Sequence, residues 1–260
     1  MKNLSLIVPV NRLFLFLAVS LFLISCVTRS ESGPLPASVL PSDATGGSHA
    51  DAPGTAPDTV RYLALGDSYT IGESVADEGD WPNQLVDSLS IRLTDTHFEP
   101  ANILATTGWT TLNLIQAMDM QQVDTSTYDL VSLLIGVNNQ YQNLSLDGYA
   151  VEFDQLLDRA VGLAGGNAHR VFVVSIPDYG YTPFGQPSQM AISQDLALFN
   201  AACAERTASA GIPFYNITGL SQQWPAADSW VAPDGLHPSQ TQYSAWVASF
   251  VEAVEMQLRD

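Results

Sequence analysis

The chain has 260 residues, of which 27 are acidic and nine are basic, so its formal net charge is −18. This excess of negative charge argues against nucleic acids and anionic surfaces as partners, because both bind basic patches. The four histidines are scattered along the chain, and no Cys/His cluster has the spacing of a zinc site, so no metal site is expected.

The first 26 residues have the features of an export signal. Lys2 and Arg12 supply positive charge, and the apolar run over residues 13–23 is short for a membrane span. The run ends in Leu-Ile-Ser-Cys at Cys26, which resembles a bacterial lipobox. The resemblance implies an extracytoplasmic protein anchored by a lipid on Cys26, and Val27 after the cysteine favours the outer membrane. An ordinary signal peptide, with a plain thiol at Cys26, is the alternative.

Residues 27–59 and residues 60–260 differ in composition. The first stretch is rich in Ser, Pro, Ala, Gly and Asp without an apolar period, which predicts a flexible tether. Residues 60–260 are enough for one α/β domain, expected to be a monomer. Loss of the signal segment removes two of the nine basic residues and leaves a net charge of −20. If Cys26 carries lipid, the only other cysteine, Cys203, has no disulfide partner.

Strand and helix signals alternate along the domain. The expected strands are residues 61–65, 102–105, 130–135, 171–176 and 212–217, and the expected helices are residues 81–93, 110–120, 146–163, 189–210 and 240–258. The runs 130–135 and 171–176 are almost wholly apolar, which is typical of strands covered on both faces. This pattern predicts a three-layer α/β/α sandwich with a central parallel five-stranded sheet, flavodoxin-like in outline. Ligands bind such sheets at the carboxyl ends of the strands.

Two details of the helices follow from the same pattern. Leu112, Ile115 and Met118 are expected on the buried side of helix 110–120. Asp80 precedes helix 81–93 at the position of an N-cap. Glu73 and Asp80 are otherwise interpreted as solvated loop charges rather than catalytic acids.

Two segments far apart in the chain suggest nucleophilic catalysis. Ser68 follows the first strand in Gly66-Asp67-Ser68, and a serine hydroxyl needs a base before it can attack a carbonyl. His237 stands three residues after Asp234, so the carboxylate can orient the imidazole and stabilise its protonated form. Each segment alone is also compatible with an ordinary turn or helix cap.

A third and a fourth segment could stabilise the oxyanion of acyl transfer. Asn138 follows the buried strand 130–135 in Gly136-x-Asn138 and could donate its amide. Gly108 follows strand 102–105 and could donate a backbone N–H without obstruction by a side chain. A strand-end turn and a helix start are the structural alternatives.

In this order, the four segments resemble those of the SGNH/GDSL hydrolase superfamily, over essentially the whole domain. The resemblance implies a Ser68 nucleophile, a His237 base and an Asp234 orienting acid. It also implies oxyanion donors from the N–H groups of Ser68 and Gly108 and from the Asn138 side chain. The family fold is likewise a three-layer α/β/α sandwich.

Two positions depart from the family pattern. Tyr69 stands where the family name has Leu, a variable position. Asn139 stands where many members have an Asp that supports the oxyanion loop, so the geometry of this loop and the substrate preference are open.

Aromatic and polar residues near these segments are candidates for substrate binding. They are Trp109, Asn139, Tyr141 and Tyr179, and Tyr181 and Phe184 lie in the same loops. An aromatic rim suits either sugars or acyl chains. For Trp109, simple burial in the core is the alternative.

The sequence therefore predicts an extracytoplasmic serine esterase that works through an acyl-enzyme and needs no cofactor. Short-acyl, O-acetyl esters of carbohydrates or similar small esters are the expected substrates. A lysophospholipase or lipase activity, or acyl transfer to a sugar hydroxyl, is the alternative within the same chemistry. A non-catalytic glycan-binding lipoprotein is the alternative from another class, although no member of the triad is missing.

Overall fold

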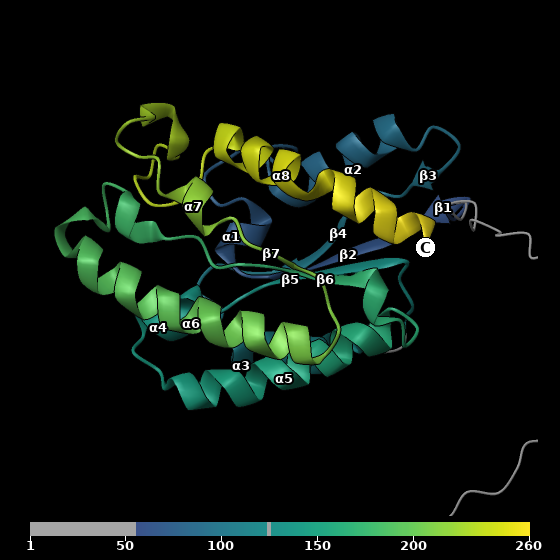
Figure 1. Cartoon of the computed structure of the whole chain (residues 1–260), viewed down its shortest axis with the longest axis horizontal. Coiled ribbons are helices and arrows are strands. Elements are labelled where there is room, and N and C mark those ends of the chain that lie inside the picture. The colour runs from purple at the N-terminus through teal and green to yellow at the C-terminus, as the bar shows by residue number, and fades with distance from the viewer. Residues whose placement is uncertain (1–55, 124–125) are drawn as a thin grey trace, which may run out of the picture. The chain divides into compact units, whose positions relative to one another are not determined.

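Five parallel strands form the centre of the domain (Figure 1). The computed structural model describes residues 56–123 and 126–260, so Cys26, the signal segment and most of the expected tether lie outside it. In spatial order the strands are β4 (Asn102–Ala105), β2 (Tyr62–Gly66), β5 (Leu130–Leu134), β6 (Val171–Val174) and β7 (Phe214–Tyr215). All four pairings are parallel, so the predicted sheet is confirmed.

Long helices cover both faces of the sheet. One layer contains α2 (Trp81–Arg92) and α8 (Gln240–Arg259), which pack against each other. The other layer contains α3 (Thr111–Gln121), α5 (Leu146–Leu163) and α6 (Gln189–Ser209) (Figure 1). This is the expected three-layer sandwich, and every residue of β2, β5 and β6 is buried within it.

Several short elements were not predicted from the sequence. They are β1 (Thr59–Val60), which pairs with β3 (His97–Phe98), the helices α1 (Ser68–Ile71), α4 (Val137–Tyr141) and α7 (Thr218–Ser221), and the 3-10 turns η2 (Ala168–Arg170), η3 (Tyr179–Tyr181), η4 (Gln186–Ser188) and η5 (Asp228–Trp230). Elements of two to five residues are too short to show a hydrophobic period. Thr59, the last residue of the expected tether, is already part of β1.

The predicted buried face of α3 is wrong in one position. Leu112 is 46% exposed, whereas Leu114, Ala117 and Met118 are buried and Ile115 is partly buried. Thr110 caps the helix with its side chain. The apolar stripe of the helix is therefore rotated by about one residue, roughly a quarter of a turn, from the expected one.

Asp80 is a buried helix cap rather than a solvated charge. It is 2% exposed, and its carboxylate accepts hydrogen bonds from the N–H of Asn83 at 2.8 Å and from the amide of the same residue at 2.8 Å. The cap predicted for α2 is confirmed, and the prediction that Asp80 is a solvated loop charge is wrong.

Among the described residues, none of the helices combines the length and apolar character required to cross a membrane.

Candidate active site

The turn after β2 places Ser68 at the carboxyl edge of the sheet. Ser68 is the first residue of α1, and Asp67 caps this helix by accepting a hydrogen bond from the Tyr69 N–H at 3.0 Å. A Cβ on Gly66 would lie 2.0 Å from Thr70 Oγ1 and 2.5 Å from the carbonyl oxygen of Leu134. Only glycine therefore lets the turn pack this closely against β5.

A continuous chain of hydrogen bonds joins the three residues expected to act together. The Ser68 Oγ lies 3.0 Å from His237 Nε2, and His237 Nδ1 lies 2.6 Å from Asp234 Oδ2. These distances match the reach of a nucleophile, its general base and the acid that orients the base. Ser68 and His237 are 5% and 8% exposed, so the serine and the imidazole are shielded from bulk water, whereas Asp234 at the other end of the chain is exposed.

Asp234 is held in its ionised form by its neighbours. Its partial burial acts to raise the pKa, but hydrogen bonds from the side chains of His237 and Ser74 and from two backbone N–H groups outweigh this effect and lower the pKa to about 2. Asp234 Oδ1 accepts from the N–H groups of Leu236 and His237 at 2.9 and 3.0 Å, and Ser74 donates to Oδ2 at 2.7 Å. The carboxylate therefore remains charged and oriented through the neutral pH range.

Three groups that could stabilise an oxyanion surround the same space. Ser68, Gly108 and Asn138 all line one cavity of about 250 Å³. The Ser68 N–H belongs to the first residue of a helix, where N–H groups have no partner within the helix. One hydrogen of the Asn138 amide is donated to the Trp109 carbonyl at 2.9 Å, and an amide NH₂ carries a second.

Gly136 is required for the position of Asn138. Its φ of 127° lies in a region that L side chains rarely adopt, and a Cβ would lie 2.6 Å from Tyr149 Cε2 and 2.9 Å from Ile176 Cδ1. The glycine thus lets β5 turn sharply into α4. This turn brings the second residue of α4, Asn138, to the cavity.

The cavity has a mainly apolar wall beside the reactive groups. The residues that line it are Ser68, Thr107, Gly108, Val137, Asn138, Tyr141, Tyr179, Phe184, Leu236 and His237. Tyr141, Tyr179 and Phe184 are in mutual ring contact, with centroids 6.2 to 6.4 Å apart. The structure therefore brings Tyr141 and Tyr179 to the cavity, and their contact with a substrate stays a prediction.

Asn139 and Trp109 are not among the residues that line the cavity, and their contact with a substrate stays a prediction. Asn139 is 1% exposed, and its amide accepts from the Thr111 N–H at 3.0 Å and donates to Thr111 Oγ1 at 2.7 Å. Its side chain thus joins α4 to the start of α3 and supports the loop between them. Trp109 is partly buried against the core, and its carbonyl holds Asn138.

Sequence reasoning missed two contacts in the loop after α1. Ser74 donates to the carboxylate of Asp234, and the Thr107 hydroxyl donates to Glu73. Glu73 is therefore bound to the segment that carries Gly108 rather than being a free loop charge. Ser74 and Asp234 are 160 residues apart, so no local pattern indicates their contact.

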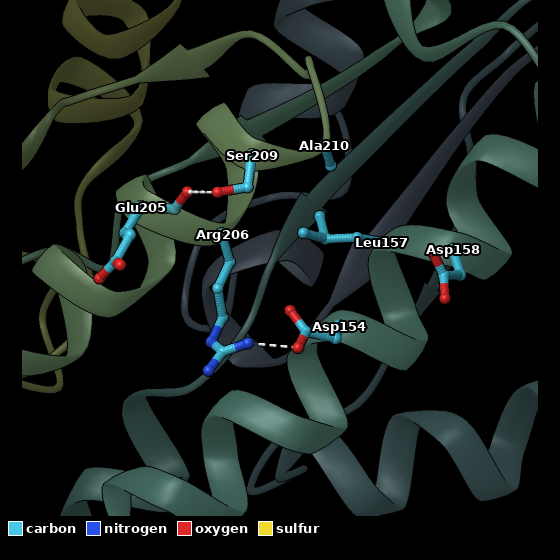
Figure 2. Close-up of a pocket in the computed structure, with 7 residues that line it drawn as sticks. All are labelled: Asp154, Leu157, Asp158, Glu205, Arg206, Ser209 and Ala210. Atoms are coloured by element: carbon cyan, nitrogen blue, oxygen red, sulfur yellow. Dashed lines mark hydrogen bonds and ion pairs between the residues drawn. The ribbon is translucent and has the colours of Figure 1, made fainter. Parts of the chain in front are cut away.

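Other parts of the described chain offer little for a metal or a second site. No group of three or more His, Cys, Asp and Glu side chains within residues 56–123 and 126–260 is arranged to hold a metal ion. A hollow of about 440 Å³ lies between α5 and α6. Figure 2 shows Arg206 reaching across it to Asp154, and it contains none of the site residues.

A serine, a histidine and an aspartate linked by hydrogen bonds in this way, at the carboxyl edge of an α/β/α sandwich, are the arrangement expected of a serine hydrolase. The sequence profile of the GDSL-like lipase/acylhydrolase family matches residues 64–245. The chain belongs to this family, and it is a GDSL-type carboxylic ester hydrolase.

Solved structures share the fold. The psychrotrophic esterase EstA from Pseudoalteromonas sp. matches with a TM-score of 0.58 and 13% identity, covering 78% of this chain and 100% of that one. The lipase/acylhydrolase from Enterococcus faecalis has a TM-score of 0.53 and 21% identity, covering 75% and 95%. The acetylxylan esterase Axe2 from Geobacillus stearothermophilus has a TM-score of 0.56 and 19% identity, covering 75% and 94%. No curated protein sequence matches the chain.

Proposed function

We propose that the protein hydrolyses short-acyl carboxylic esters through an acyl-enzyme formed on Ser68. The observation that carries this proposal is the hydrogen-bonded chain from Ser68 Oγ through His237 to Asp234, which opens into the 250 Å³ cavity. Ser68, Gly108 and Asn138, the residues expected to supply the oxyanion donors, line the same cavity as His237, which supports the proposal.

The proposed reaction has two half-reactions. Ser68 Oγ bonds to the ester carbonyl carbon while its proton passes to His237 Nε2, and the negative charge that develops on the carbonyl oxygen is stabilised by the Ser68 and Gly108 N–H groups and by the Asn138 amide. His237 then protonates the leaving alcohol as the C–O bond breaks. Water, deprotonated by His237, attacks the acyl-enzyme, and the acid and free Ser68 are released.

The dimensions of the cavity support a short acyl group. Its volume of about 250 Å³ lies below the roughly 300–1,000 Å³ that is typical of sites for larger ligands. A protein of the same fold is an acetylxylan esterase. We therefore propose O-acetyl esters of carbohydrates or similar small esters as the substrate class.

A series of p-nitrophenyl esters from acetate to palmitate tests this proposal. We expect hydrolysis to be fastest at acetate and to fall by about a thousandfold or more in Ser68→Ala and His237→Ala, because members of a triad act as a unit. Ser90→Ala is the matched control, since Ser90 is exposed on α2 and its hydroxyl bonds only to the Val86 carbonyl in the described contacts. Equal rates for the folded Ser68→Ala variant and the wild type would contradict the proposal, and a maximum at palmitate would contradict the short-acyl preference.

We also propose that the protein is exported and anchored by a lipid on Cys26, as its lipobox-like segment predicts. In a bacterial host, labelled palmitate should be incorporated into the wild type and not into Cys26→Ala, and only the wild type should fractionate with membranes. Cys203→Ala is the control, because Cys203 is a buried thiol of the core. Equal labelling of the wild type and Cys26→Ala would exclude the anchor.

A further inference from the structure

Three aromatic rings form one wall of the active-site cavity. Tyr141 comes from α4, Tyr179 from η3, and Phe184 from the segment that follows η3. Tyr141 and Phe184 are 56% and 50% exposed, so their ring surfaces are open to an incoming ligand. Tyr179 is buried, and its hydroxyl donates to Gln140 Oε1 at 2.8 Å. This bond holds the ring that both other rings contact.

Three carboxylates lie one or two hydrogen bonds away from residues that line the cavity. Asp234 and Glu73 bond directly to the cavity residues His237 and Thr107. Behind the aromatic wall, Gln140 links the Tyr179 hydroxyl to Asp195, whose carboxylate accepts from the Gln140 amide at 3.4 Å. Burial raises the pKa of Tyr179 to about 12, and the nearby Asp195 and Asp178 act in the same direction. The negative charge of Asp195 and Asp178 therefore acts on the Tyr179 ring of this wall.

No lysine or arginine lines the cavity. The described residues include six arginines. Arg61 and Arg170 lie beside the amino ends of β2 and β6. The other four lie in the later turns of long helices, which run back toward the amino ends of the strands: Arg92, Arg159, Arg206 and Arg259. One of them, Arg206, lies in the hollow of Figure 2. The carboxyl edge of the sheet, where the ester would react, thus has aromatic faces and negative charge without a compensating cation among its lining residues.

Such a site discriminates between esters by their charge. Aromatic faces attract cations, most strongly quaternary ammonium groups, and surrounding carboxylates raise the local concentration of positive ligands. An anionic group on the ester would meet repulsion and find no basic partner. We propose that the preferred substrates are small esters whose alcohol part has a quaternary ammonium group, bound against Tyr141, Tyr179 and Phe184. This inference rests on the proposed ester hydrolysis, and within the proposed short-acyl class it selects small amino-alcohol esters over carbohydrate esters. In that reaction the amino alcohol is the group that leaves with the proton from His237.

Two esters of the same shape test the charge alone. Acetylcholine has a positively charged nitrogen where its neutral analogue, 3,3-dimethylbutyl acetate, has a carbon atom. With the purified protein, we expect kcat/KM for acetylcholine to exceed that for the analogue by about fivefold or more. The ratio should fall as ionic strength is raised to about 0.5 M, because salt screens the carboxylates, and the part that comes from contact with the rings should remain.

Variants of the exposed ring localise the effect. Tyr141→Leu removes the aromatic face and keeps apolar bulk, so the ratio of the two kcat/KM values should fall. Tyr141→Phe keeps the face and should keep the ratio. The ratio is the readout because it is independent of any general loss of activity in a variant.

The outcomes separate this inference from the function on which it rests. Hydrolysis of p-nitrophenyl acetate with equal kcat/KM for the charged and neutral esters would overturn the cationic substrate class and leave the esterase intact. A wild-type ratio that is unchanged in Tyr141→Leu would overturn the assignment to the aromatic wall. Failure of the folded protein to hydrolyse any of the three esters would overturn the proposed function and this inference with it.

Discussion

Ser74 contacts the expected orienting acid from outside the triad. Its hydroxyl donates to the same oxygen of Asp234 that accepts from His237, and its backbone has a φ of 67°. Ser74→Gly removes the hydroxyl while keeping a residue that adopts this backbone conformation freely. We expect kcat to fall about tenfold with little change in KM, because a hydrogen bond to a charged group contributes about 1.5 kcal/mol. Steady-state kinetics on p-nitrophenyl acetate measure this.

The comparison for Ser74 is Ser90→Ala, which removes an exposed serine hydroxyl far from the site. A kcat for Ser74→Gly within twofold of that for Ser90→Ala would show that Ser74 has no positioning role.

Asp67 couples the stability of the protein to pH. Burial raises the pKa of its carboxyl to about 7, although the N–H groups of Tyr69 and Gly136 act in the opposite direction. Between about pH 4 and pH 7 the folded state then retains a proton that the unfolded state has lost, so stability falls as pH rises through this range. Asp67→Asn caps a helix equally well and cannot ionise. We expect the drop in Tm between pH 5 and pH 8 to be smaller in this variant than in the wild type.

Asp87→Asn is the control for Asp67→Asn. Asp87 is exposed on α2, so its replacement removes the same charge without the burial. If both variants show the same pH dependence of Tm, net charge rather than the buried Asp67 carboxyl is responsible.

At the scale of elements, two glycines with opposite surroundings give a matched pair. Gly136 has a φ of 127° and neighbours within 3 Å of a would-be Cβ, whereas Gly162 lies within α5 with nothing within 4 Å. Gly136→Ala should therefore lower the free energy of unfolding by about 2–4 kcal/mol, through overpacking and backbone strain. Gly162→Ala should raise it by about 0.5–1 kcal/mol, because alanine is the better helix former. Urea denaturation of both variants checks the signs, and a Gly136→Ala variant as stable as the wild type would contradict the role of this turn.

The sequence predicts best the helices and strands whose own hydrophobic pattern marks where they begin and end. α5 begins and ends at the residues expected from its apolar period, and β4 covers the expected residues 102–105. The fifth strand was expected over 212–217, but only Phe214 and Tyr215 form β7. This strand lies at the edge of the sheet and pairs with β6 alone, so its length depends on one neighbour rather than on its own composition.

At the scale of the whole molecule, charge should control stability. The chain has 27 acidic residues, nine basic residues and a sequence pI near 4.2, so the folded state is subject to self-repulsion at neutral pH. Raising sodium chloride from about 10 mM to 500 mM should raise Tm at pH 7, because salt screens this repulsion. The increase should be much smaller near pH 4.2, where the net charge vanishes. If salt raises Tm equally at both pH values, general exclusion of salt from the protein surface, rather than screening of charge, causes the increase.

The sequence by itself determined the sandwich, the order along the chain of its five central strands and its long helices, and the identity of the residues that could form a nucleophile, a base and an acid. Those features depend on hydrophobic period and on short motifs, which are local properties of a chain. Only the tertiary structure decided that Asn139 bonds to Thr111, that Ser74 bonds to Asp234, and that no arginine or lysine lines the cavity. These features join segments as far as 160 residues apart, and the distance between such segments is set by how the layers pack, which no local pattern contains.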